Sequence, residues 1–243
     1  DYGMPQKRHR IYFLGYHKST KIYKELIKSD KSAWLLKLGV LAKAFKVKKV
    51  EPEKTFELNG SLDELSKSFN KNGKLSPFLN TGLMINGQVM TLKSSAVYKG
   101  KQTFLRDIVQ TKDIDNSFYL TSNELKDWKY LKGAKKIERT NSKGFVYTYS
   151  EGSMSFPDSL EKPSRTIITG EGGPAPSRFK HVIKQRNKFR RLTPVELERL
   201  NMFPDNHTKL DGITDSKRAF FMGNALVVGV IEKIGSTLLK SID

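Results

Sequence analysis

Apolar positions recur along the chain at two different spacings, which separate helical stretches from extended ones. In residues 20–45 they return every three or four positions with lysines between them, and this predicts helices. Residues 61–69 predict a short helix with Ser61 as its N-cap and Glu64 completing a capping box. The stretch 20–70 therefore predicts helices joined by charged linkers.

Four other segments predict extended structure. RIYFLGY at 10–16 is short, apolar and aromatic, which is typical of a buried strand. Within residues 78–94, Asn-Gly at 86–87 lies between two apolar runs, and this predicts a hairpin. KGFVYTYS at 143–150 and RTIIT at 165–169 predict further strands.

Helical spacing returns at 120–131 and dominates from Arg190 onward. The tetrapeptide TPVE at 193–196 predicts a helix start, with threonine as N-cap, proline at the first helical position and glutamate completing a capping box. After Gly-Asn-Ala at 223–225, apolar positions through Leu238 predict a buried terminal helix. This mixture of helices and strands indicates an α/β protein.

The charge balance points to polyanionic partners. The chain has 44 Lys and Arg against 25 Asp and Glu, a formal net charge of +19. A field of that sign attracts nucleic acid first and acidic membrane surfaces second, although a lysine-rich, AT-biased genome is an alternative source of the excess. No apolar run approaches the roughly 20 residues of a membrane span, and no signal peptide opens the chain. We therefore expect a soluble protein with no membrane partner.

The chain contains no cysteine and only four histidines. The absence of cysteine excludes disulfides, thiolate metal sites and a cysteine nucleophile supplied by these 243 residues. The histidines are scattered, without the spacing of a metal site, so we expect no metal.

Three motifs carry candidate chemistry. Gln6, Arg8 and Arg10 alternate, so an extended chain would point them to one face, where arginines suit a phosphate or a carbonyl oxygen; a basic strand without a role is the alternative. Residues 190–196 read R-x-L-T-P-x-E, which we interpret as a capped structural helix rather than a catalytic element. Residues 223–225 are expected to open the terminal helix, whose backbone N–H groups could meet an anion.

Together and in this order, the three motifs resemble the C-terminal blocks of the DNA (cytosine-5) methyltransferases, P-Q-x-R-x-R, R-x-L-T-P-x-E-x-x-R-L-x-x-F-P-D and G-N-A/S-V. With their flanks, the blocks cover residues 1–16 and 190–243. The chain departs from the pattern at Leu226, where the family usually has valine. The matching residues are Pro5, Gln6, Arg8, Arg10, Arg190, Leu192, Thr193, Pro194, Glu196, Arg199, Leu200, Phe203, Pro204, Asp205, Gly223, Asn224 and Ala225.

This resemblance implies a fold and a division into domains. The fold is an incomplete Rossmann-like α/β methyltransferase domain, made of a first strand and terminal helices, with an inserted mixed α/β target-recognition domain. We expect residues 1–18 to end the catalytic domain. Residues 19–185 would form the target-recognition domain with a helical insertion, and 186–243 would return to the catalytic domain. The stretch 20–70 has no counterpart that we can place.

The resemblance also implies a reaction that this chain cannot complete alone. In the family, a cysteine thiolate attacks C6 of a cytosine flipped from the duplex, and C5 takes the methyl group of S-adenosylmethionine. The blocks that hold the nucleophile and most of the methyl donor are absent here. We expect the chain to be inactive without an N-terminal methyltransferase segment, in cis or as a second subunit. The missing initiator Met favours a fragment over a natural second subunit.

Individual roles follow from the matching blocks. Arg10 is expected to contact O2 of the flipped cytosine, Arg8 to position a phosphate or a catalytic carboxylate, and Gln6 to support the loop. Asn224 and Ala225 are expected to touch the amino-acid end of S-adenosylmethionine, the expected cofactor.

The target-recognition domain is expected to read double-stranded DNA through two stretches, 138–153 and 166–181. Arg139 and Asn141 have side chains suited to guanine and adenine edges. The second stretch resembles the family's Thr-Leu doublet and glycine-rich recognition loop, although a phosphate-binding or flexible turn is the alternative. Lys184, Lys188 and the lysines of 132–136 are expected to contact phosphates. The candidate DNA-binding residues are Arg139, Asn141, Lys143, Thr166, Gly170, Gly172, Gly173 and Arg178.

Two other interpretations compete with the interpretation that the chain is part of a restriction-modification methyltransferase. A non-catalytic, sequence-specific DNA-binding module explains the charge and the missing nucleophile, but not the flanking blocks. A structural or regulatory protein with a degenerate tail predicts damaged blocks, whereas these are intact. For the favoured reading we expect a DNA-associated protein of the prokaryotic cytoplasm. The recognised DNA sequence does not follow from the residues.

Overall fold

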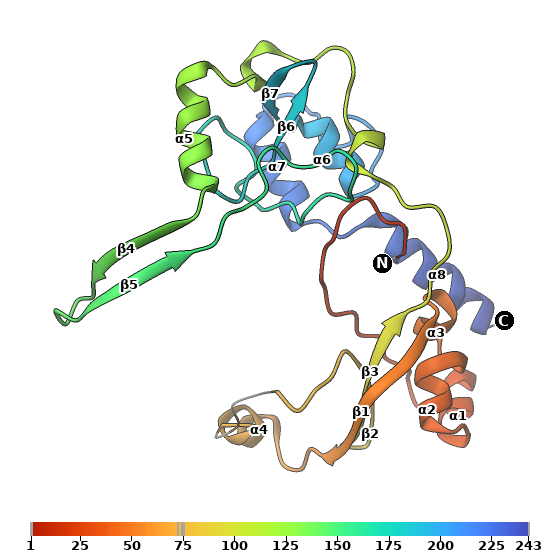
Figure 1. Ribbon diagram of the computed structural model, residues 1–243. Coiled ribbons are helices and arrows are strands. Elements are labelled where there is room, and N and C mark those ends of the chain that lie inside the picture. The colour runs from red at the N-terminus through yellow and green to blue at the C-terminus, as the bar shows by residue number, and fades with distance from the viewer. Residues whose placement is uncertain (1, 72, 74–75, 243) are drawn as a thin grey trace. The chain divides into compact units, whose positions relative to one another are not determined.

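The chain folds into two compact units, each built from segments that are far apart in the sequence. The computed structural model describes residues 2–71, 73 and 76–242 (Figure 1). Unit 1 comprises Asp1–Tyr2, Ile11–Gly100 and Ile231–Asp243, and unit 2 comprises Gly3–Arg10 and Lys101–Val230.

These units divide the chain at other points than the predicted domains. The predicted boundaries lie at 18/19 and 185/186, whereas the compact units change at 2/3, 10/11, 100/101 and 230/231. The three-part catalytic and target-recognition division therefore stays a prediction. The helical insertion expected within the recognition domain lies in unit 1, while all the residues expected to read DNA lie in unit 2.

Helices at the start of unit 1 confirm the periodicity of residues 20–45. The Thr20 side chain accepts a hydrogen bond from the Tyr23 backbone and caps the first of them, and Asp30 caps the second in the same way. The helical elements are α1 (Lys21–Lys28), α2 (Lys31–Ala33), a π-helical turn (Trp34–Leu38) and α3 (Val40–Ala44).

The core of unit 1 forms where these helices meet the end of the chain. Ile22, Leu26, Trp34 and Val40 are buried against one another. Ile234 and Leu238, on the part of α8 (Val228–Ile242) that belongs to this unit, pack against that cluster together with Leu14, Tyr16, Leu83 and Ile85. The prediction of a largely buried terminal helix holds only in part, because Ile234 and Leu238 are half-buried here while Ile231 on the same predicted face is exposed.

A three-stranded antiparallel sheet completes unit 1, in the order β1-β3-β2. Asn86 and Gly87 have positive φ angles of 48° and 82°, as a two-residue hairpin turn requires, so the predicted hairpin is confirmed. The predicted capping box of α4 is also present, with Ser61 and Glu64 bonded reciprocally. The bounds are β1 (Val47–Glu57), α4 (Leu62–Ser68), β2 (Thr81–Ile85) and β3 (Gln88–Ala96).

Strand β1 corrects the prediction of helices and charged linkers for residues 20–70. It pairs with β3, with a register shift between Val50 and Glu53 on either side of Pro52. Proline cannot donate to the ladder, so it is tolerated at an irregularity of an edge strand such as this one. A strand is usually predicted from alternating apolar and polar residues. Strand β1 has charged residues on both faces, so its sequence lacks that alternation.

The buried strand predicted for residues 10–16 is wrong in this structure. The segment has no regular secondary structure, and none of the described strands pairs with it. Ile11 and Phe13 are 80% and 91% exposed. An apolar run becomes a strand only where a neighbouring strand takes its N–H and C=O groups, and here no such neighbour is available among the described residues.

Unit 2 contains a helix, a long two-stranded ribbon, a short hairpin and two further helices. The predicted helix at 120–131 is confirmed by α5, and the predicted strand at 143–150 by β5, which begins at Val146. The hairpin β6–β7, with positive φ at Arg186 and Asn187, was not predicted. The bounds are α5 (Ser122–Lys132), β4 (Lys135–Thr140), β5 (Val146–Glu151), β6 (Val182–Gln185), β7 (Lys188–Arg191), α6 (Pro194–Leu200) and α7 (Asp215–Asn224), with 3-10 turns at Leu105–Asp107 and Asn116–Phe118.

Two further predictions for unit 2 need correction. The segment 165–169 forms no strand, and only the adjoining Ser164 makes an isolated bridge, with Gln6. The helical stretch predicted from Arg190 starts later, because Arg190 and Arg191 end β7 and α6 begins at Pro194. In both places the conformation depends on partners that are distant in the sequence, and the local spacing of apolar residues gives no information about those partners.

The core of unit 2 lies between α6, α7 and the segments that precede them. Figure 1 shows α6 and α7 close to the β6–β7 hairpin. No helix among residues 2–71, 73 and 76–242 is long and apolar enough to cross a membrane. The buried members of this core are Leu105, Ile108, Ile167, Ile183, Leu192, Leu197, Leu200, Ala219 and Met222.

Candidate functional site

Gln6 joins the opening motif to the end of α6. Its side chain is buried, and Nε2 donates to the backbone oxygen of Leu200 at 3.0 Å and to Oδ1 of Asn201 at 2.7 Å. The Ile167 backbone N–H donates to Gln6 Oε1 at 3.4 Å. An amide buried in this way is stabilising only while its partners remain in place, so Gln6 fixes three chain segments against one another.

Arg8 extends the same network to the third motif. Its terminal nitrogens donate to the backbone oxygens of Ile167, at 3.1 Å, and Gly223, at 2.6 Å. The backbone of the segment is held as well, because Lys7 N–H donates to the Ser164 oxygen at 2.8 Å and Ser164 N–H donates to the Pro5 oxygen. We call the side chains of Gln6 and Arg8 with these partners the Gln6–Arg8 network.

Arg10 lies outside this network. Its side chain is exposed, and Nη1 donates to the backbone oxygen of His9 at 2.7 Å. The alternation of Gln6, Arg8 and Arg10 thus places two side chains into unit 2 and presents the third to solvent. Of the three, Arg10 is the one that a ligand can reach directly.

Residues 223–225 do not open the terminal helix as predicted. Gly223 and Asn224 are the last residues of α7, and Ala225 is its C-cap, while α8 begins at Val228. The exposed backbone groups at a helix C-terminus are carbonyl oxygens with partial negative charge, so the predicted N–H anion site is absent here. Asn224 is exposed, and its Nδ2 donates to the Phe220 oxygen at 3.0 Å.

Close packing explains why residue 223 is a glycine. A Cβ at this position would lie 2.4 Å from the Thr169 Cα, 2.5 Å from its nitrogen and 2.6 Å from the Ile168 carbonyl carbon. Helix α7 therefore passes directly over the backbone of 168–169, and only glycine permits that approach.

The second motif is structural, as its sequence predicts. Arg190 and Glu196 are both fully buried, and their side chains form a two-pronged ion pair at 2.6 and 2.8 Å. Glu196 also completes the predicted capping box with Thr193, and it accepts a hydrogen bond from the Gln110 backbone at 2.7 Å. Charges buried this deeply need such partners, and all the contacts of this pair are internal to the fold.

The rest of this motif holds the loop after α6. Arg199 donates to both carboxylate oxygens of Asp205, at 2.7 and 2.6 Å, and to the Ile108 carbonyl oxygen. Residues that sequence reasoning missed take part as well. Glu198 is fully buried and accepts from Arg218 at 3.0 Å, and the buried Asn201 donates to the Met222 oxygen at 2.8 Å. Neither pairing has a local sequence signal.

The β4–β5 ribbon carries the first group of residues predicted to read DNA. The guanidinium of Arg139 lies 3.7 Å from the centre of the Tyr149 ring. The side-chain oxygen of Asn141 accepts from the backbone N–H groups of Lys143, at 2.9 Å, and Phe145, at 3.0 Å. Asn141 therefore builds the turn of the ribbon, while Arg139 and Lys143 are exposed.

Arg178 ties the second loop to the base of the ribbon, and its predicted contact with DNA stays a prediction. Nη1 donates to Glu151 Oε2 at 2.7 Å, and Nη2 donates to the Gly152 oxygen at 2.6 Å. By contrast, the expected phosphate contact by Lys132 is wrong, because this side chain is fully buried and donates to the Lys180 oxygen at 2.6 Å. Burial lowers the pKa of Lys132.

The glycine-rich loop has different uses for its glycines. A Cβ at Gly172 would lie 2.7 Å from the Ser216 Cα, so this glycine allows the loop to pack on α7. Gly173 has a φ of 81°, a left-handed conformation that favours glycine. At Gly170 the nearest atom to a Cβ would be 3.7 Å away, so that position is open. The hydroxyl of Thr166 donates to the Lys7 backbone oxygen.

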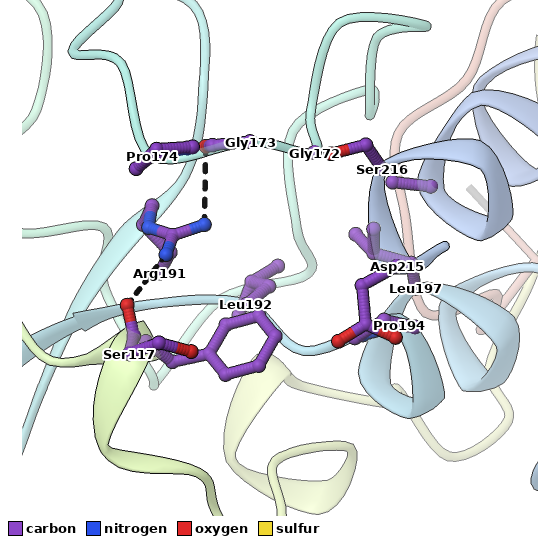
Figure 2. A pocket seen from close by; sticks show the side chains of 12 residues that line it. Ser117, Gly172, Gly173, Pro174, Arg191, Leu192, Pro194, Leu197, Asp215 and Ser216 are labelled. Carbon is purple, nitrogen blue, oxygen red and sulfur yellow. Dashed lines mark hydrogen bonds between the residues drawn. The ribbon is translucent and has the colours of Figure 1, made fainter.

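A pocket of about 210 Å³ lies beside this loop (Figure 2). Arg191 crosses it, and donates to the backbone oxygens of Gly173, at 3.0 Å, and Ser117, at 2.6 Å. Burial lowers the pKa of the Arg191 guanidinium. The lining residues are Ser117, Phe118, Gly172, Gly173, Pro174, Arg191, Leu192, Pro194, Leu197, Asp215, Ser216 and Ala219.

A buried polar chain lies under the same loop. Ser164 Oγ is 3.0 Å from His181 Nε2, and His181 Nδ1 is 2.9 Å from Glu171 Oε1. This order of groups is that of an activated serine, but all three residues are buried and therefore serve the fold. Among the described parts of the chain, no group of His, Asp and Glu is arranged to hold a metal ion.

Comparison with known proteins gives matches along almost the whole chain. Residues 1–240 match the family described as C-5 cytosine-specific DNA methylase. The chain is 35% identical over 243 residues to the type II methyltransferase M.Sau3AI of Staphylococcus aureus, covering 99% of this chain and 56% of that protein. The chain thus spans about half the length of this relative.

Two solved structures also match. The Entamoeba histolytica methyltransferase EhMeth has a TM-score of 0.41 and 10% identity, with 93% of this chain and 60% of that chain covered. The S. pombe Dnmt2 methyltransferase has a TM-score of 0.42 and 12% identity, with 91% and 64% covered.

Proposed function

Because the chain belongs to the C-5 cytosine-specific DNA methylase family, we propose that it forms the DNA-recognition and target-base support part of a DNA (cytosine-5) methyltransferase. The complete enzyme would transfer a methyl group from S-adenosylmethionine to C5 of a cytosine flipped out of a specific duplex sequence. The match to a type II methyltransferase supports a place in a restriction-modification system.

The Gln6–Arg8 network is the observation that carries this proposal. It links the opening motif to Asn201, within the second block, and to Gly223 in the third, across 195 and 215 positions of the chain. A buried network of this kind holds the groups at its edge in fixed positions. Those groups are Arg10, two residues beyond Arg8, and Asn224, next to Gly223.

Arg10 is the residue that would meet the target base. Its guanidinium is exposed and presents donors in a rigid fork, which suits the O2 carbonyl of cytosine. Arg8 would act differently from the sequence expectation. With both terminal nitrogens on backbone oxygens, it would position the segment that carries Arg10.

Asn224 and Ala225 would hold the amino-acid end of the methyl donor, and the geometry fits its ammonium group. Asn224 is exposed at the C-terminal end of α7, where the last carbonyl oxygens of the helix carry partial negative charge. A cation is favoured at such an end. Because Nδ2 of Asn224 already donates to Phe220, its side-chain oxygen is the atom that would accept from the ligand. S-adenosylmethionine supplies the methyl group when bound.

The nucleophile must come from outside these 243 residues, because the chain has no cysteine. We propose that an N-terminal methyltransferase segment, in cis or as a second subunit, supplies it together with most of the methyl-donor site. The exposed Ile11 and Phe13 are a surface on which such a segment would pack.

DNA would be met by the exposed residues of the ribbon and by the open part of the glycine-rich loop. Arg139 and Lys143 remain candidates for base or phosphate contact, as do Thr166, Gly170 and Gly173. Asn141 and Gly172 would shape these loops, and Arg178 would brace them, so their effect on sequence preference would be indirect.

The test is transfer of labelled methyl from S-adenosylmethionine to cytosine in duplex DNA. The chain would be assayed alone, and again with the N-terminal segment encoded with it, and the matched control is the same mixture with Arg10→Ala. We expect full activity in the unmodified mixture, strongly lowered activity in the mixture with Arg10→Ala, and none from the chain alone. Activity of the chain alone would overturn the argument from cysteine. Sequence-selective DNA binding without activity in any mixture would leave a non-catalytic DNA-binding module, the alternative that the absent cysteine favours.

A further inference from the structure

We propose that Phe145, at the turn of the β4–β5 ribbon, is a wedge that inserts between neighbouring base pairs of duplex DNA. This inference rests on the proposed function, since it assumes that unit 2 meets DNA. It deepens that function by naming the residue that deforms the duplex and the physical means by which it does so.

The first observation is that the turn presents an aromatic ring to solvent. Figure 1 shows the ribbon extending from α5 with its turn at the far end. Phe145 is 65% exposed there, and an added Cβ at Gly144 would meet nothing within 4 Å. Turns are made mostly of small and polar residues, so a phenyl ring at this point contributes nothing to the turn itself.

The second observation is that the ring is held on a rigid mount. Both backbone groups of Phe145 bond to Asn141: its N–H donates to the side-chain oxygen at 3.0 Å, and its carbonyl oxygen accepts from the Asn141 N–H at 3.0 Å. The Gly144 N–H donates to the Asn141 carbonyl oxygen, and Gly144 has a φ of 79°. A wedge must resist being pushed back, and these bonds supply that resistance.

The charge of the ribbon selects DNA as the partner. Lys136, Arg139 and Lys143 are exposed along it. Of the two carboxylates in the ribbon, Glu151 is already paired with Arg178 at 2.7 Å, so mainly Glu138 opposes them. A two-stranded ribbon fits a DNA groove, and apolar side chains inserted at a base step unstack and kink the duplex.

The side of the ribbon that carries Arg139 supports the same partner. Arg139 pairs across the ribbon with Tyr147 and lies over the ring of Tyr149, so a cation and two aromatic rings share one face. The opposite face has no aromatic ring and carries the pairs Lys136–Ser150, Glu138–Thr148 and Thr140–Val146. The ribbon thus has a face suited to bases and sugars directly behind the wedge.

The experiment compares two synthetic duplexes that differ only in one central abasic site. Inserting a ring at a step that is already unstacked avoids the cost of unstacking, so the 243-residue chain should bind the abasic duplex about tenfold more tightly than the intact one. Phe145→Ala should bind the two duplexes equally. The matched control Lys143→Ala, at the same turn, should weaken both by the same factor and keep the preference.

A second variant reports insertion directly. In Phe145→Trp, the indole fluorescence should fall when the intact duplex is added, because the ring stacks on bases. The control Phe13→Trp, on an even more exposed ring of unit 1, should show no such fall. A preference for the abasic duplex that survives in Phe145→Ala, or an indole at 145 that is not quenched, overturns the proposal.

The remaining outcomes separate this inference from the proposed function. If Phe145→Ala binds both duplexes like the original chain but loses affinity for the N-terminal segment, Phe145 is a protein contact and the wedge is excluded. If the unmodified chain binds neither duplex, the proposed function fails and this inference fails with it.

Discussion

At Gly223 the space of one methyl group decides how α7 packs. In Gly223→Ala the new Cβ would collide with backbone atoms of Thr169 and Ile168, which have no side-chain freedom with which to move away. We expect a loss of about 1–3 kcal/mol in the free energy of unfolding, the usual cost of overpacking a core, measured by urea denaturation.

Gly235→Ala is the matched control for this change. Gly235 lies in α8 with nothing within 4 Å of an added Cβ, so alanine there should stabilise the helix by about 0.5–1 kcal/mol. Two variants with opposite signs of the change in unfolding free energy would locate the effect in packing. Equal stability of the two would show that α7 can move away from residues 168–169.

Arg10 and Arg8 should separate activity from stability, although they lie two positions apart. In the complete enzyme we expect Arg10→Ala to lower methyl transfer about 100-fold, the typical effect of removing one donor from a reacting group, with little change in DNA affinity or stability. Arg8→Ala should lower the unfolding midpoint, because it removes the bonds to Ile167 and Gly223. Equal losses of methyl transfer and DNA binding in Arg10→Ala would show that Arg10 is only a phosphate contact.

At the scale of elements, Arg178 holds the base of the β4–β5 ribbon to the loop that follows it. We expect Arg178→Ala to speed amide hydrogen exchange in Val146–Glu151 and to relax the DNA sequence preference, because it removes the bonds to Glu151 and Gly152. Exchange followed by mass spectrometry would measure the first effect, and binding to a pool of random duplexes the second.

Arg178→Lys distinguishes bracing from direct contact with DNA. Lysine keeps the charge but cannot reproduce the two-pronged geometry of the guanidinium. We expect it to behave like alanine in both measurements. Recovery of the original sequence preference with lysine would return Arg178 to the group of residues that touch DNA.

Elements whose signals are local could be predicted from the sequence. The capping boxes that begin α4 and α6, and the Asn-Gly turn between β2 and β3, each depend on residues within four positions of one another. The segment 10–16 and β1 were wrong because a strand depends on a partner distant in sequence. Residues 223–225 lie between two helices, and the pattern alone did not show that they close α7 rather than open α8.

For the candidate site, too, features with a local sequence signal could be predicted and features that depend on distant partners could not. Sequence motifs identified Gln6, Arg8 and the 190–196 block, but not which side chains are buried. Asn201 was missed because its partners, Gln6 and Met222, are far from it in the sequence. The internal partners of Arg178, Glu151 and Gly152, could not be predicted either, because an arginine in a loop has no local sequence pattern that reveals them. Burial and pairing are tertiary facts, and they decide whether a charged residue binds a ligand or holds the fold.

For the whole molecule, buried carboxylates predict a loss of stability in acid. Burial disfavours the charged form of Asp158, but the hydrogen bonds and charges of Arg165, His181 and Lys132 outweigh it and lower its pKa. Glu171 is likewise buried, and its bonds to His181 lower its pKa. A lowered pKa in the folded state gives stability that is present above the unfolded value, near pH 4, and is lost as the pH falls through the folded value.

Thermal unfolding at a series of pH values would measure this loss. We expect the midpoint to fall steeply below about pH 4. Asp158→Asn should be less stable at neutral pH, since it removes the charge that lies 2.7 Å from Arg165. Its unfolding midpoint should also fall less steeply with decreasing pH below about pH 4. If the midpoint of Asp158→Asn falls as steeply in acid as that of the original chain, other carboxylates cause the loss of stability.

The interleaving of the two units sets an order of events during translation. The Gln6 side chain finds its partner in Asn201, 195 positions later, so residues 3–10 leave the ribosome long before the surface they pack on exists. At about 5–20 residues per second, that delay is about 10–40 s. Throughout that delay the Gln6 side chain has none of its buried partners at Ile167, Leu200 and Asn201, so the opening segment can settle into its place only after almost all of unit 2 has been synthesised.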